Sequence, residues 1–111
     1  MEKELLEIIE HFGINNQQRK LQEEVFELQE VITQKEYPAL ARNKKPNELE
    51  SLEKERITEE IADCMVILEQ FKLYYEISSE EITKIFWEKV NRTLERIESG
   101  YYEKWFYLTI T

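Results

Sequence analysis

The chain has 111 residues, a length that fits one domain with a single core and is short for two. Charged residues make up 35%, hydrophobic residues 41%, and there are two Gly and two Pro, which is typical of a helical protein and disfavours a turn-rich β fold. The formal net charge of −9 argues against nonspecific binding to nucleic acid or to an anionic membrane surface. The composition therefore predicts one all-α domain over residues 1–111.

The first two helices follow from the hydrophobic periodicity of the N-terminal third. The first covers residues 2–11 and stops at Gly13. The second covers roughly residues 16–34, with Asn15 or Asn16 as a plausible N-cap.

The third helix comes after a polar connection, Pro38–Pro46, which carries a local excess of basic residues. It begins between Asn47 and Ile57 and ends near Tyr75. The fourth helix opens with the capping-box pattern of Ser78 and Glu81.

The C-terminal region predicts how the domain is covered. The fourth helix runs to about Ser99, and Gly100 is a natural C′ residue. The tail Tyr101–Thr111 is too aromatic to be a free solvated end, so we expect it to pack on the helices or on a second subunit. Phe26 and Trp87 point off their apolar arcs and suggest subunit contacts. These features predict a four-to-five-helix bundle with an aromatic tail, assembling into a dimer or tetramer.

The cellular setting follows from the single cysteine and from the lack of long apolar runs. Cys64 permits no internal disulfide, which favours an intracellular, cytoplasmic protein. No apolar run approaches the ~18 residues of a membrane span. The N-terminal residues are too acidic for a signal peptide. We therefore expect no membrane partner.

The second predicted helix carries two carboxylates three residues apart, Glu24 and Glu27, and this spacing puts both on one face. On a wheel of ~100° per residue the apolar stripe of this helix consists of Leu21, Val25, Leu28 and Ile32. Glu24 lies at the edge of the stripe. Glu23 and Glu30 point to the far side, and Glu23 has the character of ordinary surface.

The third predicted helix carries a second pair, Glu60 and Asp63. Its apolar arc consists of Ile57, Ile61, Cys64, Leu68, Phe71 and Tyr75, and Ile67 widens it. Glu60 projects inside this arc, Asp63 lies at its border, and Glu59 points away. A carboxylate in an apolar arc is costly unless it is paired, hydrogen-bonded or metal-bound.

Together the two pairs predict a metal site. Four carboxylates around one volume repel one another unless hard cations lie between them, and Mg²⁺, with Mn²⁺ as the alternative, is such a cation. On the fourth helix Lys89 projects into the apolar arc, with Arg92 and Arg96 at its edge. Metal together with nearby cations is the arrangement that a polyphosphate requires.

Plainer interpretations stay open at this point. Acidic pairs of this spacing arise often by chance in so acidic a chain. The acids could form a solvated face with pairs such as Lys20–Glu24. Lys89 could be a structural ion-pair partner for Glu60. Cys64, on a core stripe, is expected to be inert packing.

The motifs have a known counterpart. Residues 20–28 (Lys-Leu-Gln-Glu-Glu-Val-Phe-Glu-Leu), residues 59–63 (Glu-Glu-Ile-Ala-Asp), and then Lys89, Arg92 and Arg96 resemble the MazG-type all-α NTP pyrophosphohydrolases. That superfamily includes the dimeric dUTPases, the dCTP pyrophosphatases and the phosphoribosyl-ATP pyrophosphohydrolases. Its hallmark is E-x-x-E followed by E-x-x-D, and the resemblance spans residues 13–100.

The resemblance implies an activity and its residues. Hydrolysis of a (deoxy)nucleoside triphosphate between the α- and β-phosphates would give a monophosphate and pyrophosphate and would serve nucleotide-pool cleaning. The implied metal-binding and catalytic residues are Glu24, Glu27, Glu60 and Asp63. The implied substrate-binding positions are Lys89, Arg92, Asn91, Lys20 and Gln17, and Arg96 extends the cationic stripe. The alternatives are a phosphoribosyl-ATP-type pyrophosphohydrolase and a non-catalytic acidic helical interaction or regulatory protein.

Overall fold

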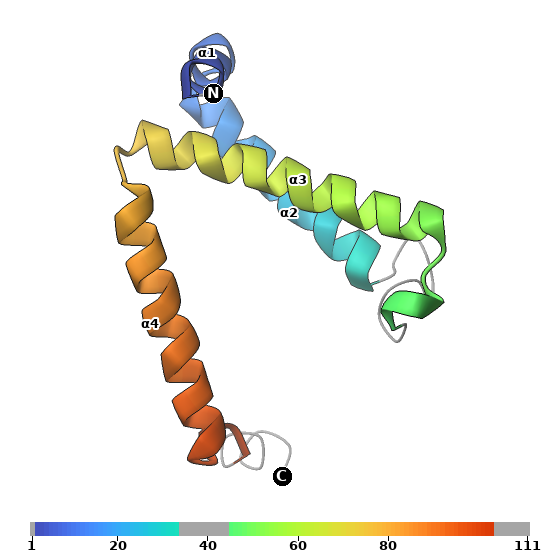
Figure 1. The fold of residues 1–111 in the computed structure, drawn as a ribbon. Helices are drawn as coiled ribbons and strands as arrows, with labels where there is room; N and C mark the ends of the chain where they lie inside the picture. Colours follow the sequence, from blue (N-terminus) through green and yellow to red (C-terminus); the bar gives the residue numbers. More distant parts are fainter. Residues whose placement is uncertain (1, 34–44, 104–111) are drawn as a thin grey trace. The chain divides into compact units, whose positions relative to one another are not determined.

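The computed structural model describes residues 2–33 and 45–103, and over these residues the chain is all-helical. The elements, in chain order, are α1 (Glu2–Phe12), α2 (Ile14–Thr33), the short 3₁₀ helix η1 (Pro46–Glu48), α3 (Ser51–Tyr74) and α4 (Ser79–Glu98) (Figure 1). The internal contacts of the chain divide it into two compact units, Met1–Glu76 and Ile77–Thr111. The predicted all-α class is therefore confirmed for the described residues.

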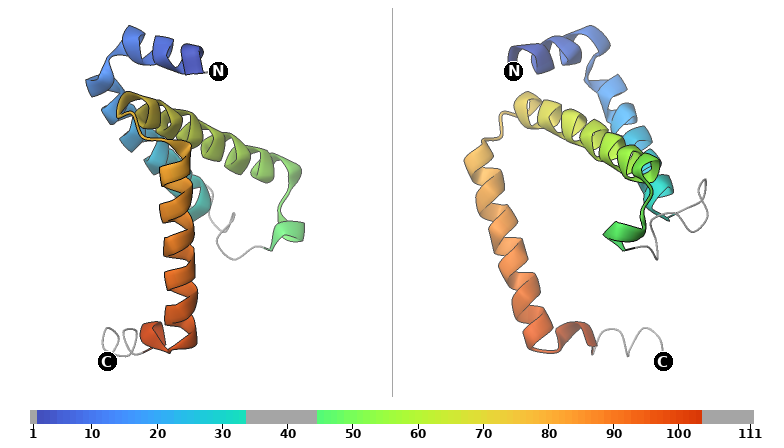
Figure 2. Two further views of the ribbon diagram at one scale, coloured as in Figure 1. Left: turned by 60° about the vertical axis from the view of Figure 1, so that its left-hand side comes forward. Right: turned by 45° about the vertical axis from the view of Figure 1, so that its right-hand side comes forward.

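Helices α2 and α3 form an antiparallel pair in the first unit. Figures 1 and 2 show them side by side, with α1 over the C-terminal part of α3. Two hydrogen bonds set the register: the Gln17 amide nitrogen donates to the Gln70 carbonyl oxygen at 2.6 Å, and the Cys64 thiol donates to the Glu24 backbone oxygen at 3.4 Å. Rising residue numbers on α2 therefore meet falling numbers on α3.

A single residue, Gly13, connects α1 to α2. Its φ of +85° lies in the left-handed region, which glycine adopts without the steric cost that other residues meet. Its N–H donates to the Ile9 carbonyl oxygen at 2.8 Å, and its own carbonyl accepts from the Gln17 N–H at 3.1 Å. Gly13 thus ends one helix and starts the next, as the sequence predicts for the end of α1.

The predicted N-cap of the second helix is wrong. Helix α2 begins at Ile14, so Asn15 and Asn16 lie inside its first turn. The Asn16 side chain donates instead to the Phe12 carbonyl oxygen at 2.6 Å, which satisfies a group at the end of α1. Because Gly13 alone connects the two helices, no residue with a capping side chain lies between them.

The buried stripe of α2 differs from the predicted one. Gln17, Glu24 and Val31, each seven residues from the next, are buried against the neighbouring helices. Val25 and Ile32, predicted to face the core, are exposed within the first unit. The reason is that α1 and α3 both pack on the Gln17–Glu24–Val31 side of α2, which leaves the other edge of its apolar arc uncovered in this unit.

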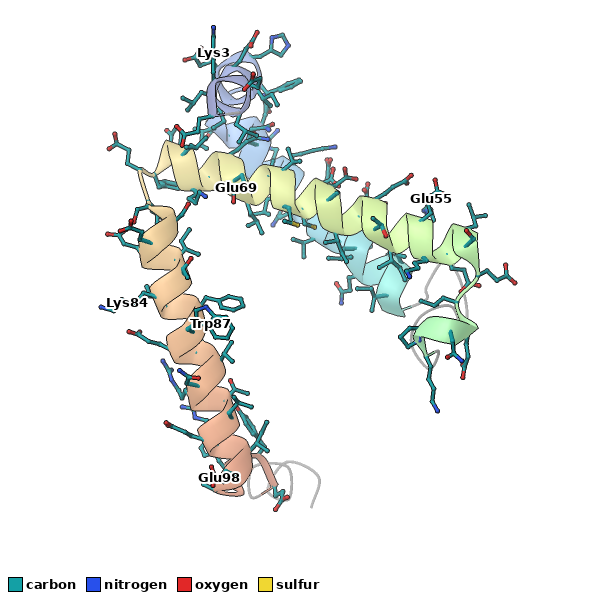
Figure 3. The ribbon with its side chains drawn as sticks, in the orientation of Figure 1. Lys3, Glu55, Glu69, Lys84, Trp87 and Glu98 are labelled. Atoms are coloured by element: carbon teal, nitrogen blue, oxygen red, sulfur yellow. The ribbon has the colours of Figure 1, made fainter. Side chains whose placement is uncertain are left out.

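The buried residues of α3 are Glu60, Cys64, Ile67 and Gln70. The predicted arc is confirmed at Cys64 and Ile67, whereas Ile61 and Leu68 are exposed within the first unit. Glu55 and Glu69, which Figure 3 labels, are among the exposed residues of α3.

Helix α4 has the predicted ends. The Ser78 hydroxyl accepts a hydrogen bond from the Glu81 N–H at 3.1 Å, and Gly100 follows the C-cap residue Ser99 with a φ of +75°. Taken by itself, α4 buries none of its residues. Residues 38–44 of the predicted polar connection Pro38–Pro46 and residues 104–111 of the predicted tail Tyr101–Thr111 lie outside the described residues. Among the described helices, none is long and apolar enough to cross a membrane.

Candidate metal centre and adjoining cleft

Four carboxylates from α2 and α3 converge in the first unit. Glu24, Glu27, Glu60 and Asp63 each offer an oxygen, and these oxygens all lie within 4.8 Å of one another. The antiparallel register brings the two pairs together, because each helix carries its two acids three residues apart on one face. These are the two acidic pairs that the helical wheels turn inward.

Burial divides the cluster into two kinds of carboxylate. Glu24 is 5% exposed and Glu60 is 8% exposed, whereas Glu27 and Asp63 are open to solvent. One oxygen of each buried acid, Oε2, has no hydrogen-bond partner among the described residues. A buried polar oxygen without a hydrogen-bond partner costs free energy, so these two oxygens call for an explanation.

The surroundings of Glu60 disfavour its charged form. Burial raises the pKa of the Glu60 carboxyl, and the charges of Glu27, Asp63 and Glu24 raise this pKa further. Arg56 is the group that acts in the opposite direction. A cation among these carboxylates would favour the charged form of Glu60, because an opposite charge stabilises a carboxylate.

The chemistry of the donors fits a hard cation. All four groups are carboxylates, and Mg²⁺ and Mn²⁺ prefer oxygen ligands. The one sulfur nearby is the buried thiol of Cys64, whose pKa burial raises, so that it stays protonated. The thiol hydrogen is directed at a backbone oxygen. The four carboxylates are therefore an all-oxygen donor set.

Lys20 is paired with the edge of the cluster. Its Nζ lies 3.0 Å from Glu24 Oε1 and 3.7 Å from Glu23 Oε2, and the hydrogen bond to Glu24 raises the pKa of the ammonium group. The Lys20–Glu24 pair of the plainer interpretation is thus present. It occupies one oxygen of Glu24 and leaves the other, Oε2, to the cluster.

A cleft of about 600 Å³ adjoins the carboxylates. It is lined by α1, α2 and α3, and at its acidic end by Glu24 and Asp63, with Lys20 and Arg19 contributing positive charge. Glu23 also lines it, and its side chain is 63% exposed, as predicted for a surface residue. The cleft therefore joins the four-carboxylate cluster to a surface with both signs of charge.

Sequence reasoning missed two residues of this region. Gln70 is 3% exposed and lines the cleft. It lies seven residues, two helical turns, after Asp63, and that shared face was the available signal. Arg56 lines a second, smaller cavity of about 320 Å³ together with Glu60. The spacing of four residues between Arg56 and Glu60 was the signal there.

The predicted substrate-binding residues divide between the two units. Gln17 and Lys20 line the cleft beside the carboxylates. The others lie on α4 in the second unit, namely Lys89, Asn91, Arg92 and Arg96. Their contribution to phosphate binding, and the alternative pairing of Lys89 with Glu60, stay predictions.

Fold and site together define an all-helical chain, over the described residues, with a four-carboxylate cluster beside a cleft. Comparison with protein-family models, with curated proteins and with solved structures gives no match. The resemblance to the MazG-type pyrophosphohydrolases therefore stays a prediction from the motifs of residues 20–28 and 59–63.

Proposed function

We propose that this chain is a Mg²⁺-dependent, cytoplasmic nucleoside triphosphate pyrophosphohydrolase that acts on free (deoxy)nucleotides. The observation that carries the proposal is the pair of buried Oε2 atoms of Glu24 and Glu60, which lack partners among the described residues inside a cluster of four carboxylates. A purely structural acidic face would leave its carboxylates in water, where they cost little.

The proposed roles of the four carboxylates follow from their exposure to solvent. Glu24, Glu27, Glu60 and Asp63 would hold Mg²⁺, with Mn²⁺ as the alternative. When bound, the ion would neutralise the triphosphate and lower the pKa of water. Glu27 and Asp63 are the exposed members, so they can meet the attacking water and accept its proton.

The cations of the chain would hold the phosphates. Lys20 and Arg19 line the cleft and can donate charge-assisted hydrogen bonds to phosphate oxygens. Lys89, Arg92 and Arg96 would add to this in the role that their wheel positions predict, with Asn91 near the substrate. Water would add to one phosphorus of the α–β bridge, the bridging P–O bond would break, and pyrophosphate would leave with the nucleoside monophosphate as the second product.

The test is pyrophosphate release by Glu60→Gln, which keeps the shape of the side chain and removes its charge. We expect the wild-type chain to release pyrophosphate from a nucleotide panel with Mg²⁺ and the variant to lose at least about a hundredfold in rate. Helical content by circular dichroism should be retained. Glu59→Gln, one residue away and exposed, is the matched control. Orthophosphate as the sole product, or full activity in Glu60→Gln, would contradict the proposal.

Two rivals give different results in simple assays. A phosphoribosyl-ATP-type enzyme would release pyrophosphate from a phosphoribosyl nucleotide and not from free NTPs or dNTPs. A non-catalytic helical interaction protein is favoured by the Lys20–Glu24 ion pair, which already satisfies part of the cluster. It predicts that Mg²⁺ leaves the melting temperature unchanged.

Light scattering would test the predicted dimer or tetramer, and a monomer would contradict it.

A further inference from the structure

We propose that Gln17 and Gln70 form the base-recognition end of the cleft, where their amides read the hydrogen-bonding edge of a nucleobase. The inference deepens the proposed function and rests on it for the phosphate end of the ligand. It adds a substrate class, nucleotides with an intact base, and two residues that select among bases.

The amide pair is a built site. Gln17 is 6% exposed and Gln70 is 3% exposed, and both line the cleft. Their hydrogen bond of 2.6 Å uses the Gln17 nitrogen and the Gln70 oxygen. The Gln17 oxygen and the Gln70 nitrogen lie outside that bond, so the pair offers one acceptor and one donor. Turning both amides by ~180° reverses the order and still leaves one of each.

That pattern is complementary to a nucleobase. The edge that bases use for Watson–Crick pairing carries a donor next to an acceptor, and enzymes read an extruded base through hydrogen bonds to this edge and by stacking. Two buried glutamines are also an expensive way to hold two helices together, because they lose side-chain entropy and hydration that an apolar pair would not lose. Recognition gives a reason for that cost.

The walls around the amide pair are apolar. Ile8 and Phe12 line the cleft from α1, and Val66 and Ile67 line it from α3. The Phe12 side chain is 53% exposed, so its ring has surface available for stacking. A ligand that consisted of phosphate and sugar alone would gain little from these walls.

The spacing along the helices fits one nucleotide. Gln17 precedes Glu24 by seven residues on α2, and Asp63 precedes Gln70 by seven on α3, a separation of roughly 10 Å along each helix axis. Lys20 lies between the two ends. A nucleotide can therefore lie along the cleft with its base at the amides and its phosphates at the carboxylates.

The first test compares bases in the pyrophosphate assay. Gln17→Met/Gln70→Met removes both amides together, so neither is left unpartnered, and Gln22→Met on the exposed side of α2 is the control. We expect the wild-type preference among four bases to shrink by at least about tenfold in kcat/KM. On ribose 5-triphosphate, which has no base, the kcat/KM of the double variant should stay within about twofold of the wild-type value. An unchanged ranking of bases, or an equal loss on ribose 5-triphosphate, would overturn the proposal.

The second test needs neither catalysis nor a variant. Nucleosides without phosphate are titrated into the wild-type chain in EDTA, and the side-chain amide resonances are followed by ¹H–¹⁵N NMR. We expect the Gln17 and Gln70 amides to shift with one nucleoside more than with the others. If they do so while no nucleotide is hydrolysed, base recognition stands and the proposed function fails. If no nucleoside or nucleotide moves these amides, base recognition fails whatever the chain hydrolyses.

Discussion

The two ends of the α2–α3 contact are built from polar residues of similar burial, yet they differ in how those residues are satisfied. At one end Gln17 and Gln70 hydrogen-bond each other at 2.6 Å. At the other end Glu24 and Glu60 each bury an oxygen without a partner among the described residues. The two amides of the first end are partners for each other within the chain. The carboxylate end is satisfied only in part by the described residues, because Lys20 pairs with one oxygen of Glu24 while both Oε2 atoms stay without a hydrogen bond.

The largest expected effect is therefore that of metal on stability. Mg²⁺ should raise the free energy of unfolding by about 2.7 kcal/mol when its free concentration is a hundred times its Kd. Thermal denaturation in EDTA and in Mg²⁺ measures this. Glu24→Gln/Glu60→Gln should abolish the shift, and Glu55→Gln/Glu59→Gln, which changes two exposed acids of α3, should retain it. If the wild-type chain melted at the same temperature in EDTA and in Mg²⁺, the expectation that Mg²⁺ stabilises the carboxylate end would be wrong.

The amide end should respond to mutation and not to metal. Gln70→Leu leaves the Gln17 amide buried without its partner and should cost roughly 1–3 kcal/mol in urea denaturation. Gln17→Met/Gln70→Met should recover most of that loss, because both polar groups go together. Each value should be the same in EDTA and in Mg²⁺. A double variant as unstable as the sum of the singles would mean that the pair is not the closed unit that its hydrogen bond indicates.

The smallest expected effect is the pH dependence of Glu60 without metal. Burial and the neighbouring acids raise the folded pKa of Glu60 above its unfolded value, so the folded state binds this proton more tightly. The charge therefore lowers stability above the folded pKa, and that loss vanishes as pH falls below the unfolded pKa.

Glu60→Gln should accordingly be more stable than wild type in EDTA by roughly 1 kcal/mol near pH 8, and the gain should shrink toward about pH 4. Urea denaturation at both pH values measures it, with Glu59→Gln as the control that shows no such pH dependence. A Glu60→Gln chain less stable than wild type near pH 8 would show that the buried charge is already compensated by the protein.

The pairing of the acids within each helix was predictable because it depends on the helix itself. Residues three apart share a face in any α-helix, so Glu24 with Glu27 and Glu60 with Asp63 had to point together. The burial of Glu60 followed from its position in an apolar arc. Neither inference needed knowledge of the neighbouring helix.

The burial of the apolar residues was less predictable because it depends on which neighbours are present. Val25 belongs to a good helical stripe and is nevertheless exposed within the first unit, since α1 and α3 pack on the side of α2 that carries Val31. Gln70 was missed because glutamine is usually a surface residue. The absent asparagine cap followed from the geometry of Gly13, which a propensity argument does not contain.

The equal intervals of seven residues make the α2–α3 contact a molecular ruler. An α-helix rises ~1.5 Å and turns ~100° per residue, so one residue inserted between Gln17 and Glu24 would swing the acids away from the cleft. An insertion of about one turn would keep both ends on the same side and increase their separation by ~5 Å. If a nucleotide binds along the cleft as proposed, the ligand length that fits would change only in steps of whole helical turns.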